Sequence, residues 1–153
     1  MPRIALRIVV DTHRGTLVGV PRLVELLRKH GASATFFFAL GPDHTGRALG
    51  SALQRGRIGH YGIKTLLYGT LLPGPDIGRA CRDILVGTRD AGFEVGMHAW
   101  SATRWRKRIE HAAADWTEAE MTRAMERFTE IFDTAPHAHA APDWQTNIHA
   151  FRL

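Results

Sequence analysis

Apolar residues run almost without interruption through two short segments near the start of the chain. Residues 3–10 (RIALRIVV) and 34–40 (ATFFFAL) carry apolar side chains at most positions. Continuous runs of this length, unlike alternating ones, are typical of strands buried in a parallel sheet. We therefore predict two buried parallel strands over 3–10 and 34–40.

Between these two strands the apolar spacing changes to that of a helix. The apolar positions recur at 3.6-residue spacing: Val20, Leu23, Val24 and Leu27. Pro21 suits the first helical turn, and Gly31 suits the position just past the last turn. A strand, a helix and a strand in so few residues predict a right-handed βαβ unit.

The second half of the chain repeats this alternation. Asp76 suits the cap of a helix that precedes a strand predicted over 93–98 (FEVGMH). The pair Thr117 and Glu120 has the spacing of a capping box and predicts the start of another helix. A fourth strand is predicted over 137–142 (HAHAAP).

The intervening segment, residues 41–75, contains recurring Gly and closes on LLPGP, which predicts loops. Alternating strands and helices predict an α/β fold of parallel βα units. We assign the whole chain, 1–153, to a single domain.

Composition narrows the class of protein. Twenty Lys and Arg against 15 Asp and Glu give a net charge of +5, which favours anionic partners. The single cysteine, Cys81, excludes an intrachain disulfide framework, suits a reducing compartment and is predicted to lie in the core. The first apolar run is too short for a signal peptide. We expect a cytoplasmic protein and leave peripheral membrane contact open.

Polar residues stand at the carboxyl ends of two predicted strands, where ligands gather in parallel sheets. Asp11 follows the first strand, and His98 ends the strand over 93–98. A carboxylate and an imidazole together suit Zn²⁺ or another first-row divalent ion. Asp11 also suits a turn or a helix cap, and His98 also suits a hydrogen-bonded structural role. Both interpretations stay open on this pattern.

A basic cluster, RWRKR over 104–108, has two interpretations. Cations beside an aromatic residue suit nucleic acid, whose phosphates they neutralise. A solvated surface loop is favoured because the cluster is brief and acidic residues follow it. No nucleic-acid motif accompanies the charge, so we expect no nucleic-acid partner.

Four segments together resemble the polysaccharide deacetylase family, which is also named for nodulation chitooligosaccharide deacetylase. In chain order they are RIVVDTHRGT, GVPRLVELLRKHGASATFFFALGPDHTGR, EVGMHAW and AAPDW. The resemblance is strongest to the N-terminal half of the branch that deformylates undecaprenyl-phosphate-linked 4-formamido-arabinose. It implies a distorted (β/α) barrel, of which 1–153 is expected to form an incomplete part. It also implies a lipid-linked amino sugar phosphate as the partner, in lipid A modification and polymyxin resistance at the cytoplasmic face of the inner membrane.

The resemblance further implies a catalytic metal. In the family a divalent ion, Zn²⁺, Co²⁺ or Mn²⁺, is held by one Asp and two His, polarises the amide and activates a water. A second Asp serves as general base and a late His as general acid. Asp11 matches the metal Asp, and His98 matches the first metal His. Four further residues are expected to bind substrate: Arg14, Asp43, Arg47 and His139.

Two positions depart from the family pattern. Val9 stands at the position of the base, and Ala102 stands at the position of the second metal His. The chain also ends before the segments that supply the general acid. We therefore expect weak metal binding and impaired hydrolysis. The alternative is a non-catalytic sugar-phosphate-binding remnant of the same fold. An uncovered parallel sheet also predicts self-association.

Overall fold

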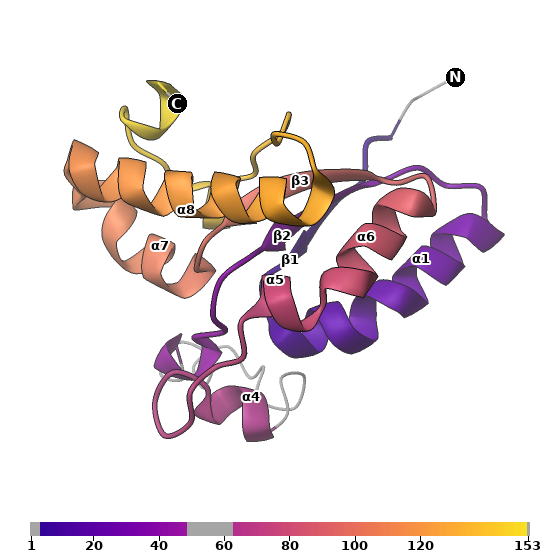
Figure 1. The fold of residues 1–153 in the computed structure, drawn as a ribbon, viewed down its shortest axis with the longest axis horizontal. Coiled ribbons are helices and arrows are strands. Elements are labelled where there is room, and N and C mark those ends of the chain that lie inside the picture. Colours follow the sequence, from indigo (N-terminus) through magenta and orange to yellow (C-terminus); the bar gives the residue numbers. More distant parts are fainter. Residues whose placement is uncertain (1–3, 49–62, 153) are drawn as a thin grey trace.

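A three-stranded parallel sheet lies at the centre of the fold in the computed structural model, which describes residues 4–48 and 63–152 (Figure 1). The strands are β1 (Arg7–Val10), β2 (Thr35–Ala39) and β3 (Glu94–Ala99), in the spatial order β1-β2-β3. Both neighbouring pairs are parallel. The predicted strands over 3–10, 34–40 and 93–98 are therefore confirmed, the first two with shorter bounds and the third shifted by one residue.

The helices alternate with these strands along the chain. They are α1 (Val20–Lys29), α4 (Ile63–Leu67), α5 (Ile77–Ala80), α6 (Arg82–Asp90), α7 (Ala102–Arg108) and α8 (Ala114–Phe132). A π-helical segment, η1 (Gly15–Gly19), leads into α1, and short 3₁₀ segments are η2 (Thr45–Ala48), η3 (Ile109–His111), η4 (Pro142–Trp144) and η5 (Ala150–Arg152). Figure 1 shows α1 beside α6 over the sheet, with α8 along β3.

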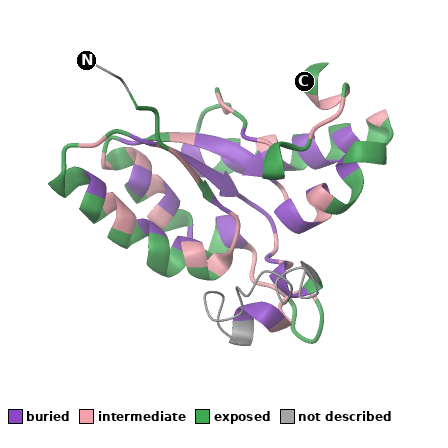
Figure 2. Cartoon of the chain, turned by 180° about the vertical axis from the view of Figure 1, so that it is seen from behind, coloured by how far each residue is buried: buried purple, intermediate pink, exposed green. Residues whose placement is uncertain are grey.

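One hydrophobic core fills the space between the sheet and these helices. Phe36 and Phe38 of β2 and Met97 of β3 lie in it beside Leu85 of α6 and Phe128 of α8, and all five are buried. Full burial of such a side chain contributes about 1.5–3 kcal/mol. Figure 2 shows the buried positions at the centre and the exposed ones on the outer sides of the helices. Alternate strand residues point to the other face, which carries Val9, Phe37 and His98.

β1 is the edge strand of the described sheet, so the prediction that it is fully buried is wrong. Val10 is buried, whereas Val9 is 38% exposed. Leu6 and Ile4, which precede the strand, are exposed as well. Val10 points into the core beneath the helices, whereas Val9 points to the opposite face of the sheet, which is covered less completely at β1.

Local helix signals are confirmed around α1 and α5. Gly31 follows α1 with a φ of +60°, the left-handed conformation that glycine adopts most readily. The Asp76 side chain accepts a hydrogen bond from the Arg79 amide at 3.0 Å, which makes it the cap of α5. Cys81, between α5 and α6, is buried as predicted.

The predicted capping box and the predicted surface loop are both wrong. α8 begins at Ala114, three residues before Thr117, whose hydroxyl donates to the Ala113 carbonyl. Glu120 is buried and pairs with Arg104 at 3.0 Å, so it caps nothing. Residues 104–108 lie in α7, and Trp105 is buried in the core, so the segment packs against the protein and is not a solvated loop.

The predicted strand over 137–142 is reduced to a single bridge. The Met97 amide donates to the Ala138 carbonyl, and the Ala140 amide donates to the Met97 carbonyl, both at 2.9 Å. Pro142 then opens η4, so the pairing with β3 ends there. The predicted irregular segment 41–75 contains η2 and α4, and its central part, 49–62, lies outside the described residues.

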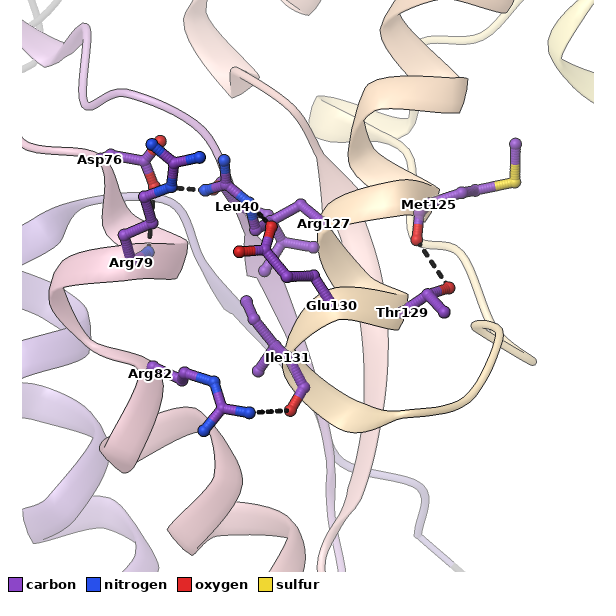
Figure 3. Close-up of polar contacts among 9 residues, drawn as sticks. All are labelled: Leu40, Asp76, Arg79, Arg82, Met125, Arg127, Thr129, Glu130 and Ile131. Atoms are coloured by element: carbon purple, nitrogen blue, oxygen red, sulfur yellow. Dashed lines mark hydrogen bonds and ion pairs between the residues drawn. The ribbon is translucent and has the colours of Figure 1, made fainter.

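Arg127, a buried residue of α8, joins this helix to α5 and to the end of β2 (Figure 3). Its guanidinium donates to the Asp76 carboxylate at 2.5 Å, to the Glu130 carboxylate at 2.8 Å and to the Leu40 carbonyl at 3.4 Å. The Arg127 side chain is only 8% exposed. It therefore fixes α8 relative to the carboxyl end of β2.

Candidate functional site

The carboxyl end of the sheet places Asp11 directly after β1. Its side chain is partly buried, at 29% exposed, and its Oδ2 forms an ion pair with Nη2 of Arg106 at 2.7 Å. The following turn is closed by the Thr12 hydroxyl, which accepts a hydrogen bond from the Gly15 amide at 2.9 Å. A Cβ on Gly15 would meet that oxygen at 2.8 Å, so a larger residue there would displace the Thr12 hydroxyl. The backbone thus fixes the direction in which Asp11 leaves the strand.

His98 lies in β3 on the face of the sheet that carries Val9. Its Nδ1 donates to the Ala140 carbonyl, which leaves Nε2 as a buried acceptor without a partner among the described residues. Burial lowers the pKa of His98 to about 4, although the hydrogen bond to Ala140 and the Asp11 carboxylate oppose the shift. The imidazole is therefore neutral at pH 7. One ring nitrogen on a carbonyl and the other free is the arrangement of a metal-ligating His.

Arg106 of α7 lies between two carboxylates. Besides its pair with Asp11, its Nε lies 3.0 Å from Oδ2 of Asp143. Burial lowers the pKa of Arg106, but the two carboxylates outweigh that effect and raise it. Arg106 also lowers the pKa of His98, so its charge acts within the same site.

The segment that carries Asp143 has an unusual backbone. Asp143 and Trp144 have φ values of 50° and 62°, in the left-handed region that non-glycine residues adopt at a cost of about 1–3 kcal/mol each. Contacts on both sides hold them there: Asp143 pairs with Arg106, and the Arg7 guanidinium lies 4.0 Å from the centre of the Trp144 ring. Strain maintained by surrounding contacts is a feature of functional sites.

The residues at this site do not fit a tightly held metal ion. His98 offers one free nitrogen, but Asp11 already pairs with a guanidinium, and Ala102 has no ligating atom. Within residues 4–48 and 63–152, no three His, Cys, Asp or Glu side chains are grouped so that they could hold a metal. The pair Asp11 and His98 supplies at most two of the four protein and water ligands that Zn²⁺ requires.

Asp43, predicted to bind substrate, is 1% exposed and engaged by the protein itself. Its Oδ2 accepts from the His13 amide at 2.8 Å, and its Oδ1 accepts from the amide and hydroxyl of Thr45 at 2.9 and 2.6 Å. A carboxylate satisfied in this way ties the loop after β1 to the loop after β2. Asp43 thus holds these two loops in place beside the site, and its direct contact with substrate stays a prediction.

The other three predicted substrate residues differ in their surroundings. Arg14 is exposed beside η1, and Arg47 is exposed with its Nε donating to the Gly69 carbonyl at 2.7 Å. His139 lies beside β3, and its Nε2 donates to the His98 carbonyl at 3.0 Å. Their substrate roles stay predictions.

Sequence reasoning assigned no role to Arg106 or Asp143. Arg106 lay in a cluster interpreted as a surface loop, and Asp143 lay in the AAPDW segment, which carried a resemblance but no function. Helical spacing is the sequence signal that could have identified Arg106, because position 106 lies one turn after position 102 and hence on the same helix face.

Comparison with known proteins gives a family match over most of the chain. The family profile described as polysaccharide deacetylase matches residues 14–149. The probable 4-deoxy-4-formamido-L-arabinose-phosphoundecaprenol deformylase ArnD of Shewanella sediminis (strain HAW-EB3) is 41% identical over 117 residues. That alignment covers 71% of this chain and 38% of the relative, so the chain spans well under half of the relative's length.

Solved structures share the fold. A putative polysaccharide deacetylase from Mycobacterium smegmatis superposes with a TM-score of 0.63 at 20% identity, over 97% of this chain and 46% of that one. A family 4 acetyl xylan esterase from Clostridium thermocellum, in complex with a cobalt ion, gives a TM-score of 0.58 at 17% identity, over 97% and 52%. These likenesses confirm the predicted fold class, parallel βα units forming part of a barrel.

Proposed function

Because the chain belongs to the polysaccharide deacetylase family, we propose that its site serves the deformylation of an amino sugar linked to undecaprenyl phosphate. The identity to the Shewanella sediminis deformylase supports this substrate class. The observation that carries the proposal is the buried Nε2 of His98, which has no hydrogen-bond partner within the described part of the chain and whose pKa the Asp11 carboxylate influences. Both residues stand where the family resemblance places its metal ligands.

The same residues support impaired hydrolysis by this chain. Val9, at the position of the general base, has no atom that accepts a proton, and Ala102 contributes no ligand. When bound, a divalent ion would supply Lewis-acid polarisation of the formamide. Asp11 and His98 would hold such an ion weakly, because Asp11 already pairs with Arg106 and His98 offers only its Nε2.

The exposed arginines beside the site suit the phosphate of the substrate. Arg14 lies in the turn after β1, and Arg47 lies in η2, which follows β2. Guanidinium groups bind phosphate oxygens in a bidentate manner. No helix within the described ranges is long and apolar enough to cross a bilayer. We propose that the lipid-linked substrate is met at the cytoplasmic face of the inner membrane.

Two measurements on the full chain test this function. The first is binding of a 4-formamido-arabinose phosphate, where Arg14→Gln and Arg47→Gln should weaken binding. Arg28→Gln, an exposed position at the far end of α1, serves as the control and should leave it unchanged. Absence of binding by the unaltered chain would contradict the substrate class.

The second measurement is release of formate with Zn²⁺ or Co²⁺ present. The unaltered chain should release formate slowly, because Val9 cannot act as the general base, a role worth roughly 10²–10⁴-fold in rate. Fast release that disappears in Asp11→Ala would contradict the impairment and show that another group acts as base. Binding without any release above the free-metal rate would match the non-catalytic alternative and contradict deformylation at this site.

A further inference from the structure

We infer that Arg106 is the resident cation of this site and keeps divalent metal ions out of it. The missing second His alone would leave a weak metal site, open to repair at position 102. A guanidinium held against Asp11 predicts something different: the site stays closed to metal even when the missing ligand is restored. This inference concerns the charge balance of the site and does not depend on the substrate proposed above.

Helix geometry directs the Arg106 side chain along the helix face that carries the small side chain of Ala102. The two residues are one turn apart on α7 and lie on the same face. Long side chains on a helix lean toward its N-terminus, so the guanidinium extends back over the preceding turn. Ala102 is buried and adds no volume beyond its methyl group. An imidazole at 102 would therefore extend from the same helix face as the Arg106 side chain that pairs with Asp11.

The Arg106 guanidinium contacts two carboxylates, those of Asp11 and Asp143. Its side chain is 28% exposed, and it lies 2.7 Å from Asp11 and 3.0 Å from Asp143. Charges that are partly buried are screened less by salt than surface pairs. A divalent ion on Asp11 would meet a like charge at contact distance, or would have to displace it and leave Asp143 without its partner.

The backbone on both sides of Arg106 is fixed. Trp105 is buried, and its indole nitrogen donates to the Gln145 carbonyl at 2.8 Å, which ties α7 to the segment that carries Asp143. The contact between Arg106 and Asp143 is thus positioned by packing and not by the ion pair alone. A preformed arrangement resists displacement better than a flexible surface pair does.

The test is a double-mutant cycle on metal affinity. Calorimetry with Zn²⁺ and Co²⁺ compares the unaltered chain, Ala102→His, Arg106→Gln and the double variant. Arg108→Gln, an exposed arginine on the same helix, is the charge-matched control. We expect Ala102→His alone to gain little, and the double variant to bind more tightly than the two single effects predict, by on the order of tenfold. Arg108→Gln should leave the affinity unchanged.

Equal affinity of Ala102→His and the double variant would overturn the inference, because Arg106 would then not oppose the metal. Arg106→Lys in the Ala102→His background tests the role of charge. It keeps the cation, so it should still exclude metal; an affinity as high as that of the Gln variant would also overturn the inference. Thermal unfolding of the Ala102→His chain gives an independent readout. Millimolar Co²⁺ should leave its Tm unchanged, and a clear rise would contradict exclusion by Arg106.

Discussion

Replacing Arg127 by methionine should destabilise the fold by about 2–3 kcal/mol. Loss of one partner from a fully buried ion pair costs about 3–5 kcal/mol. Here the loss is smaller, because the Asp76 side chain is 26% exposed and Glu130 is more exposed still, so water solvates both carboxylates. The Leu40 carbonyl also keeps its hydrogen bond from the Gly78 amide at 3.2 Å. Methionine retains most of the apolar stem that packs between α8 and α5.

The free energy of unfolding is measured by urea denaturation at a fixed m-value, together with the thermal midpoint. A loss of 2–3 kcal/mol corresponds to a fall in Tm of about 5–10 °C for a chain of this size. Arg123→Met, on the same helix, is the matched control. Its side chain is 52% exposed and lies 3.5 Å from Glu120, which keeps Arg104 as a partner. The control should cost less than about 1 kcal/mol.

Equal losses in Arg127→Met and Arg123→Met would refute the reasoning, since burial would then make no difference to the pair. A coupling experiment sharpens the result. In the Asp76→Asn background, Arg127→Met should cost less than it does in the unaltered chain, because the carboxylate that it strands is gone. Additive losses would show that the two side chains do not interact in solution.

Three further predictions follow from burial and exposure. Burial raises the pKa of Cys81 from 9.0 to about 11, so at pH 8 its alkylation should be on the order of a hundredfold slower in the folded chain than in urea, from thiolate content alone. The raised pKa also adds to the free energy of unfolding below pH 9, and this added stability should be lost as the pH rises from 9 to 11. Equal labelling rates in the folded chain and in urea would contradict the raised pKa and therefore both predictions. Val9→Asp should change the free energy of unfolding by less than about 1 kcal/mol because the side chain is 38% exposed, and a loss above about 2 kcal/mol in urea would show that the face is covered. Sedimentation velocity should show self-association that Leu6→Lys, beside the edge strand, reduces and Leu71→Lys, in the distant loop, does not; an unaltered chain that sediments only as a monomer would contradict the role of the edge.

The sequence by itself determined the order of strands and helices and several of their ends. These features depend on residues close together in the chain. Continuous apolar runs mark β1 and β2, and the 3.6-residue spacing marks α1. Asp76 and Gly31 act within one turn of the helix ends beside them. Asp11 and His98 could be placed at the carboxyl ends of their strands for the same reason, since a strand's end is a local feature.

Only the tertiary structure decided what those two residues contact. Arg106 is 95 residues from Asp11 in the chain, and it reaches that carboxylate because buried Trp105 anchors α7 beside the sheet. Asp143 joins them from a third segment, held in a left-handed conformation that no local pattern predicted. Contacts between distant segments depend on how the core packs, and the spacing of neighbouring residues does not determine that packing. The charge balance at the end of β1 therefore became visible only in the folded chain.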